Sequence, residues 1–128
     1  MIYLDSSVVL AHLLAEDRRP PASLWEQPLV SSRLLQYEVW NRINAWEPGA
    51  GHRSAARGLL ERVYWIELAP AVLARALEPF PVPVRTLDAL HLASLQYLHL
   101  LGTAVELASY DKRLVGAARA LGVTVAET

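Results

Sequence analysis

Ile2-Tyr3-Leu4-Asp5-Ser6-Ser7 opens the chain and decides how it folds. Residues 2–5 have the pattern of a short buried strand that ends on Asp5, and Ser6-Ser7 then offers an N-cap for a helix over 8–16. A strand that passes directly into a helix is the repeating unit of α/β folds, in which ligands bind at the carboxyl ends of the strands. The opening therefore predicts an α/β fold with Asp5 at its ligand-binding edge.

The rest of the chain repeats this alternation. Short apolar runs predict further strands over 29–31, 65–68, 104–109 and 123–125. Helical spacing predicts helices over 22–26, 33–47, 52–64, 71–77, 87–101 and 112–121. Thr86 is the expected cap of the 87–101 helix, and Gly102 and Gly122 are expected at helix ends. The order predicts one domain over 1–128: a three-layer α/β/α fold whose central parallel sheet has about five short strands.

Length and composition agree with a single domain. The 128 residues are 53% hydrophobic, which is enough to fill one core. The absence of cysteine excludes disulfides, thiolate metal sites and cysteine nucleophiles, and it is compatible with a reducing compartment. Neither a signal peptide nor an apolar run of about 18 residues is visible, so we expect a cytoplasmic protein that does not enter a membrane.

The charge balance limits how the chain could hold nucleic acid. A formal net charge of -1 argues against binding through an overall positive field, although a local basic patch remains possible. The basic residues are eleven arginines and Lys112, and the planar guanidinium group suits bidentate phosphate contacts. A GC-rich coding bias would explain the same preference for arginine.

Four carboxylates lie where strands pass into helices, or in a helix beside such a point. Asp5 and Asp111 come directly before or at helix starts, and Asp88 lies in a first helical turn, where capping or the helix dipole would by itself explain an acidic residue. Glu38 differs, because it lies in mid-helix beside an apolar stripe, where an unpaired carboxylate would be costly. Arg42, one turn later, could pair with it.

Taken together, the acids indicate a metal site. We expect the first and fourth strands to be neighbours across the point where the strand order reverses. Asp5 and Asp111 would then lie side by side, and Asp88 would arrive from the helix that leads into the fourth strand. Carboxylates this close repel one another unless a cation intervenes. Oxygen ligands without histidine or cysteine suit Mg²⁺ or Mn²⁺, and such ions assist phosphoryl chemistry.

Four segments resemble, in order and spacing, the successive motifs of PIN-domain ribonucleases, and most closely those of the VapC toxins of toxin-antitoxin pairs. They are Ile2-Tyr3-Leu4-Asp5-Ser6-Ser7, Ser31-Ser32-Arg33-Leu34-Leu35-Gln36-Tyr37-Glu38-Val39, Arg85-Thr86-Leu87-Asp88-Ala89-Leu90-His91-Leu92-Ala93 and Ser109-Tyr110-Asp111-Lys112-Arg113-Leu114. The resemblance covers essentially the whole chain, so a PIN-like fold is expected throughout.

The resemblance implies a Mg²⁺- or Mn²⁺-dependent endoribonuclease that cuts single-stranded RNA (tRNA, rRNA or mRNA) by water attack. In that family an acidic quartet is catalytic and binds the metal, and the matching residues here are Asp5, Glu38, Asp88 and Asp111. The three aspartates would be metal ligands, directly or through water, and the glutamate would orient the water or complete the shell. Ser6 or Ser7 matches the hydroxyl position after the first acid, and Ser109 replaces the usual threonine.

The resemblance also implies protein partners: a second copy in a homodimer, and a cognate VapB-like antitoxin that inserts a segment into or beside the acidic groove. Trp40 points away from the apolar stripe of its helix, so it could offer an aromatic surface to a partner, be an isolated exposed aromatic residue, or be covered by the next helix. Arg85 could contact a phosphate or form an external ion pair, and His91 could approach the metal or be a satisfied helix histidine. No role is assigned to Glu106.

Rival α/β folds with aspartates at strand ends fit less well. Signalling receivers need an acidic pair after the first strand, where this chain has Ser6-Ser7, and its only lysine directly follows Asp111. Haloacid-dehalogenase-type phosphatases need a second aspartate where Ser7 stands. A non-catalytic PIN-like module that binds RNA or protein remains the alternative, although retention of four mutually repelling acids favours cleavage.

Overall fold

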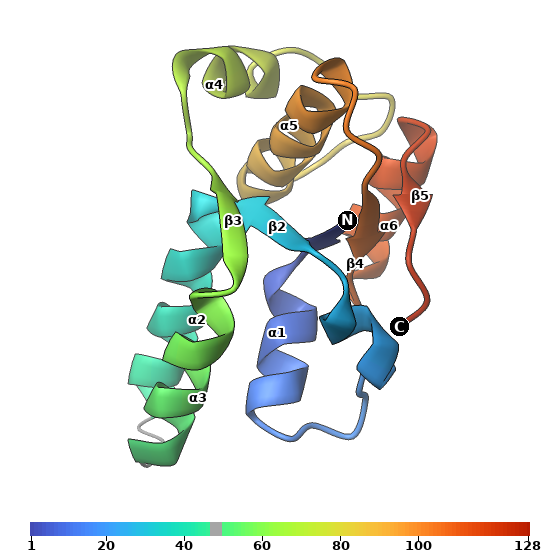
Figure 1. The fold of residues 1–128 in the computed structure, drawn as a ribbon. Coiled ribbons are helices and arrows are strands. Elements are labelled where there is room, and N and C mark those ends of the chain that lie inside the picture. Colours follow the sequence, from blue (N-terminus) through green and yellow to red (C-terminus); the bar gives the residue numbers. More distant parts are fainter. Residues whose placement is uncertain (47–49) are drawn as a thin grey trace.

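The computed structural model of the chain describes residues 1–46 and 50–128. Within these residues, five parallel strands form one central sheet in the order β3-β2-β1-β4-β5 (Figure 1). The strands are β1 (Ile2–Leu4), β2 (Leu29–Ser32), β3 (Val63–Ile66), β4 (Glu106–Ala108) and β5 (Thr124–Val125). The predicted parallel sheet is confirmed.

Helices cover both faces of the sheet, as Figure 1 shows. The described part of the chain holds a 3₁₀ helix, η1 (Ala22–Glu26), and the α-helices α1 (Ser6–Leu13), α2 (Arg33–Trp46), α3 (Ala50–Leu60), α4 (Pro70–Ala76), α5 (Thr86–Leu100) and α6 (Lys112–Ala120). Helices α1, α2 and α3 pack on one face, α5 and α6 on the other, and α4 lies against α5. The predicted three-layer α/β/α architecture is therefore confirmed.

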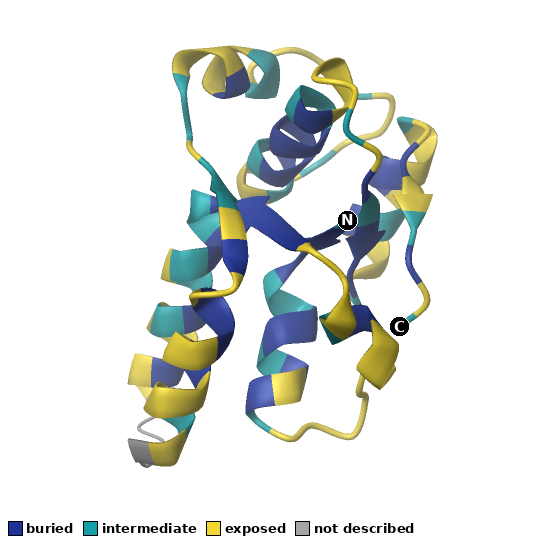
Figure 2. Ribbon diagram, viewed as in Figure 1, coloured by how far each residue is buried: buried dark blue, intermediate teal, exposed yellow. Residues whose placement is uncertain are grey.

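Strand β1 supplies both cores because successive side chains of a strand point to opposite faces. Ile2 and Leu4 are buried among side chains of α1, α2 and α3, whereas Tyr3 is buried among those of α5 and α6. The dark blue core of Figure 2 accordingly runs through the sheet and the inner sides of the helices. Burial of each large apolar side chain stabilises the fold by roughly 1.5–3 kcal/mol, so β1 anchors both layers.

The strand order places the carboxyl ends of β1 and β4 together. Leu4 is the register partner of Ala108, so Asp5 and Ser109 leave the sheet side by side. On its other side β1 pairs with β2, which follows it in the chain. Strand β1 therefore lies at the point where the strand order reverses, which is the usual ligand site of an open α/β sheet. The predicted neighbourhood of the first and fourth strands is confirmed.

Two helix caps differ from expectation. Asp5, rather than Ser6-Ser7, is the N-cap of α1: its backbone is extended and its carboxylate accepts the Ser7 N-H at 3.4 Å. Helix α1 therefore begins at Ser6, two residues early, and it ends at Leu13 rather than at residue 16. Thr86 is the first residue of α5 and not its cap, because the extended residue before it is Arg85, which makes no capping bond with its side chain.

The third strand also differs. It was expected over 65–68 after a helix over 52–64, but α3 ends at Leu60 and β3 begins at Val63. Register explains the shift, because Val63 pairs with Leu29 of β2, and this pairing lies beyond the reach of local periodicity. The predicted end of the second long helix at residue 47 lies outside the described residues. The other predicted strand and helix ends are within two residues of those observed.

Trp40 is half-buried and packs against the core below α2. The guanidinium group of Arg53, from α3, lies over its ring at 5.3 Å. The next helix thus covers part of the indole, so Trp40 is not an isolated exposed aromatic residue. No helix in the described ranges is long and apolar enough to cross a membrane.

Candidate metal centre

Asp5 is buried at the end of β1, with only 6% of its surface exposed. Its Oδ2 accepts hydrogen bonds from the hydroxyls of Ser7, at 2.5 Å, and Ser109, at 2.8 Å, as well as the weaker bond from the Ser7 N-H. Among the described residues, none donates to Oδ1 of this carboxylate. One oxygen is therefore fixed by the protein, and the other is available to a ligand.

The two hydroxyls connect Asp5 to the loop between β4 and α6. Ser7 Oγ accepts the N-H of Tyr110 at 3.0 Å, and Ser109 Oγ accepts the N-H of Asp111 at 2.9 Å. Each serine thus receives a backbone hydrogen bond from that loop and passes one to the carboxylate. Hydrogen bonds to a charged acceptor are stronger than neutral ones, so this arrangement holds Asp5 and the Asp111 backbone in one rigid unit.

Asp111 caps α6 from an exposed position. Its Oδ1 accepts the N-H groups of Arg113 at 2.9 Å and Leu114 at 3.2 Å. The capping interpretation of Asp111 is thus correct, and the Ser109 hydroxyl links the backbone N-H of Asp111 to the Asp5 carboxylate. The same bonds that cap the helix orient the carboxylate, and its second oxygen receives no bond from the described residues.

Asp88 lies in the first turn of α5 and is partly buried. Desolvation raises the pKa of this carboxyl, and the charge of Asp111 and, more weakly, that of Asp5 raise it further. The backbone N-H and the guanidinium group of Arg85 oppose the shift. The contributions of Asp111 and Asp5 to this shift indicate that their charges reach Asp88, and a cation would relieve the repulsion.

Glu38 lies on α2 with 20% of its side chain exposed, and its partner is not Arg42. Its Oε1 is 2.7 Å from Nε2 of His91, a buried residue of α5. Nδ1 of His91 is 2.8 Å from the hydroxyl of Tyr3. Both ring nitrogens are therefore engaged within the protein, and His91 is the satisfied helix histidine of the two alternatives.

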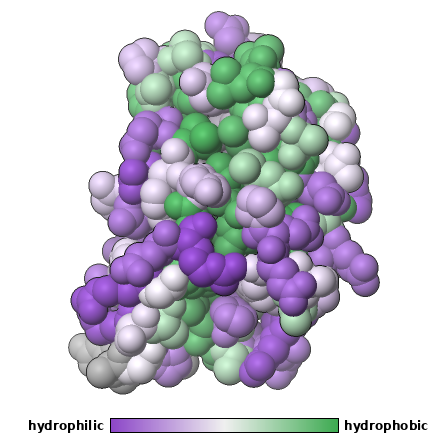
Figure 3. All heavy atoms as spheres, in the orientation of Figure 1, coloured by the Kyte–Doolittle hydropathy of each residue, from purple (hydrophilic) through white to green (hydrophobic). Residues whose placement is uncertain are grey.

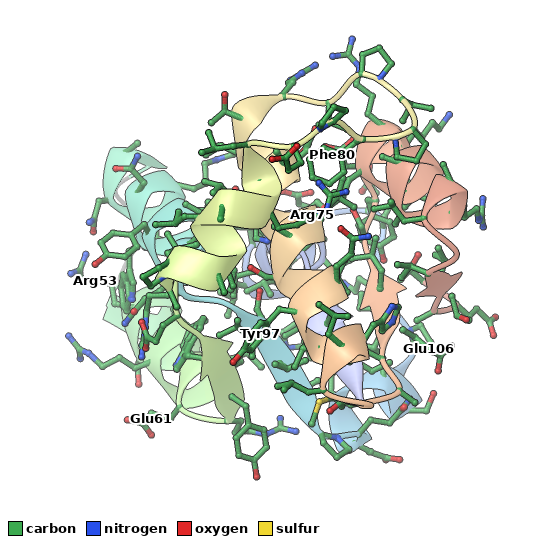
Figure 4. All side chains as sticks on the ribbon, turned by 90° about the horizontal axis from the view of Figure 1, so that it is seen from above. Arg53, Glu61, Arg75, Phe80, Tyr97 and Glu106 are labelled. Atoms are coloured by element: carbon green, nitrogen blue, oxygen red, sulfur yellow. The ribbon has the colours of Figure 1, made fainter. Side chains whose placement is uncertain are left out.

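The sequence interpretation missed the contact between Glu38 and His91. One signal was present: His91 follows Asp88 by three residues, which puts both on the same face of a helix. The bond between Tyr3 and His91 could not be predicted, because a buried tyrosine hydroxyl needs a hydrogen-bond partner but the sequence does not indicate which residue provides it. Glu106, which is labelled in Figure 4, is the first residue of β4, whereas Asp111 follows the other end of that strand.

The donor set fits a hard cation that keeps its water. Within the described residues, no three acidic, histidine or cysteine side chains lie as close as ligands that all touch one ion. Mg²⁺ commonly takes only one or two carboxylates directly and keeps several waters. Asp5 and Asp111 each present one oxygen without a hydrogen-bond donor among those residues, and Asp88 lies within their field. This chemistry suits a hydrated ion that touches one or two of these carboxylates directly.

Comparisons with known proteins agree with this geometry. The family model described as PIN domain matches residues 2–120. Ribonuclease VapC46 of Mycobacterium tuberculosis (strain ATCC 25618 / H37Rv) is 34% identical over 97% of this chain and 95% of its own length. Ribonuclease VapC35 of Mycobacterium tuberculosis (strain CDC 1551 / Oshkosh) is 30% identical over 98% and 95%.

A solved structure has the same fold. The crystal structure of Mycobacterium tuberculosis VapC20, described as a sarcin-ricin loop cleaving toxin, superposes with a TM-score of 0.71 over 100% of both chains, at 18% identity. The similarity of fold covers the sheet and all of its helical layers. Together with the match over residues 2–120 and the 34% identity, it shows that the chain belongs to the PIN-domain family, among the VapC ribonucleases.

Proposed function

We propose that this protein is a Mg²⁺- or Mn²⁺-dependent endoribonuclease that cleaves single-stranded RNA, and that it acts as the toxin of a toxin-antitoxin pair. The observation that carries the proposal is that β1 and β4 end side by side at the acidic edge of the sheet, where desolvation, and after it the charges of Asp111 and Asp5, raise the pKa of Asp88. Relatives that are named ribonucleases support the same activity. A cation bound at these carboxylates would offset the repulsion between them.

Asp5, Asp88 and Asp111 would hold the ion, and Glu38 would complete the site. A divalent ion bound at these carboxylates lowers the pKa of a water and offsets the charge of a phosphate group. The chain's own contribution is preorganisation. Serine hydroxyls fix Asp5 and backbone N-H groups of α6 fix Asp111 before any ligand arrives.

Glu38 is suited to accept a proton from the attacking water. One of its oxygens is bonded to His91, and the side chain is partly exposed, so the second oxygen can face solvent. In the step, the water oxygen forms a bond to phosphorus and its proton passes to Glu38. The bond from phosphorus to the leaving ribose oxygen breaks, and solvent protonates that oxygen. A general base in this position contributes typically about 10²–10⁴-fold to the rate.

RNA has to be held by basic side chains near the acids, because the net charge of the chain is only -1 and provides no general positive field. Arg85, Lys112 and Arg113 are exposed and lie next to the acids in the sequence. Phosphates bound by such residues release counterions, so we expect RNA affinity to fall steeply with salt.

The proposal includes two protein partners, a second copy of the chain and a VapB-like antitoxin. An apolar hollow of about 690 Å³ lies between α4, the proline-rich loop over 78–84 and the start of α5, next to Asp88 along the chain. Leu77, which lines this hollow, is exposed, and so is Leu87 close by in the sequence. Figure 3 shows further hydrophobic atoms over the upper part of the face that it presents. Light scattering at micromolar concentration tests the homodimer, and a monomer mass would reject it.

The cleavage experiment is direct. Purified protein is incubated with labelled single-stranded RNA and Mn²⁺, and the products are resolved on a gel. We expect cleavage that is abolished by EDTA and reduced at least about 100-fold by Asp5→Ala or Asp88→Ala. Glu106→Gln is the matched control, because it removes a carboxylate from the opposite end of β4 and is expected to leave the rate unchanged.

Two outcomes would reject the proposal. Cleavage that survives chelation or either aspartate substitution would come from another mechanism or a contaminating nuclease. RNA binding without cleavage in the presence of Mn²⁺ would favour the alternative, a non-catalytic PIN-like module.

A further inference from the structure

A chain of hydrogen bonds crosses the molecule from the sheet to the candidate general base. It runs from the hydroxyl of Tyr3 in β1 to Nδ1 of His91 in α5, at 2.8 Å, and from Nε2 of His91 to Oε1 of Glu38 in α2, at 2.7 Å. The tyrosine and histidine are buried, with 0% and 1% of their surfaces exposed, so water does not compete for these bonds. Three separate elements are thereby joined through polar groups.

The direction of donation follows from the partners of Tyr3. Its oxygen accepts the N-H of Ser32 at 3.2 Å, and burial raises the pKa of the phenol, so Tyr3 keeps its proton. We infer that the proton goes to Nδ1 of His91, which lies 2.8 Å from the phenol oxygen. An imidazole that accepts at Nδ1 carries its hydrogen at Nε2 in the neutral form. Nε2 therefore donates to Glu38.

We propose that His91 is a positioning residue for Glu38: Tyr3 selects the Nε2-H tautomer, and that N-H holds Oε1 so that Oε2 alone accepts the proton of the attacking water. The role rests on the proposed function. It gives a functional role to His91, which is outside the acidic quartet, and to Tyr3, which would otherwise contribute only to core packing.

Asp88 and Glu38 lie on different helices, which explains why a fixed hydrogen-bond donor to Glu38 is useful. Asp88 and His91 lie one turn apart on α5, whereas Glu38 comes from α2 on the other side of the sheet. A glutamate has three side-chain torsions, and holding it in one conformation costs entropy that a fixed donor offsets. Helix α5 therefore sets the position of Asp88 directly and that of Glu38 through His91. A misplacement of about 1 Å in a reacting group costs on the order of 10²-fold in rate.

Nitrogen NMR of the metal-free protein tests the tautomer without any assay of cleavage. We expect the Nε2 of His91 to carry hydrogen and Nδ1 to be unprotonated, and we expect Tyr3→Phe to convert the ring to a mixture of tautomers. A wild-type ring with hydrogen at Nδ1 would overturn the inference.

Two amide substitutions separate positioning from packing. In His91→Gln the amide can reach the place of Nε2 and donate to Glu38, whereas in His91→Asn it reaches only the place of Nδ1. We expect Gln to retain kcat within about tenfold and Asn to lose roughly 100-fold, with KM changed little in either. Thermal melts and Mn²⁺ affinity by electron paramagnetic resonance are expected to match between the two variants. Equal loss of kcat in both would overturn the role.

A double-mutant cycle with Glu38→Ala gives the decisive result. If His91 acts through Glu38, His91→Asn has no further effect on kcat once the carboxylate is gone, and the two losses are not additive. Additive losses in an active protein would show that the histidine acts by another route. A wild-type protein that cleaves no RNA would instead reject the proposed function, and the NMR result would still decide the tautomer.

Discussion

At the scale of single residues, the candidate site contains polar groups that have two uses. Asp5 and Asp111 cap helices and also face the acidic edge, and Ser7 and Ser109 each accept a backbone bond while donating to Asp5. Capping and ligand placement are therefore not competing explanations. The cap fixes one carboxylate oxygen, and the other is left for a ligand.

The negative charge of Asp88 suits the candidate metal site but lowers the stability of the metal-free fold. Its pKa is raised by desolvation, by Asp111 and by Asp5, so the folded state binds this proton more tightly than the unfolded chain does. Stability contributed by the protonated form is lost as the pH rises through the raised pKa, and ionised Asp88 disfavours folding at neutral pH. We expect Asp88→Asn to raise the Tm of the metal-free protein by roughly 1–4 °C while abolishing cleavage.

Calorimetry at two pH values measures this effect. The gain in Tm is expected at pH 7 and should shrink as the pH falls toward the range in which Asp88 is protonated in the wild type. Glu106→Gln serves as control, because it removes one negative charge at the amino end of β4. A variant Asp88→Asn that is less stable than wild type at pH 7 would contradict the repulsion.

At the scale of elements, the β4-α6 loop is what completes the site. Parallel pairing of β4 with β1 brings the loop beside Asp5, and α6 begins directly after Asp111. The sequence predicted this pairing, since the first and fourth strands of such an α/β sheet were expected to be neighbours where the strand order reverses. It did not predict the start of β3 at Val63, because the register of that strand is set by its pairing with Leu29.

Ser109 tests the connection between these elements. We expect Ser109→Ala to lower the free energy of unfolding by about 1–3 kcal/mol, because buried Asp5 loses a donor and the N-H of Asp111 loses its acceptor. The rate of RNA cleavage should fall about 10–100-fold, the usual effect of removing a group that orients a ligand. Ser109→Thr keeps the hydroxyl and is the matched control. Urea unfolding and initial rates measure both effects, and equal behaviour of the two variants would contradict the role of the hydroxyl.

At the scale of the whole molecule, metal binding should be visible as a change in global stability. A ligand that binds the folded state and not the unfolded chain stabilises it by about 2.7 kcal/mol at a hundredfold excess over Kd. We expect Mn²⁺ to raise the Tm of the wild type, to raise that of Glu106→Gln equally, and to leave that of Asp5→Ala unchanged. Differential scanning fluorimetry with a Mn²⁺ titration makes the comparison. A shift that persists in Asp5→Ala would place the ion elsewhere.

The sequence by itself determined the order of strands and helices, the α/β class and the four acids of the candidate site. These are recorded in local periodicity, in the residues that begin and end helices, and in motifs that span the chain. Only the tertiary structure decided that Glu38 pairs with His91 rather than with Arg42, and that Tyr3 stands behind that histidine. The reason is physical. Arg42 is one turn from Glu38 and is visible to local rules, whereas the contact with His91 spans 53 positions and exists only because the sheet brings α2 and α5 together.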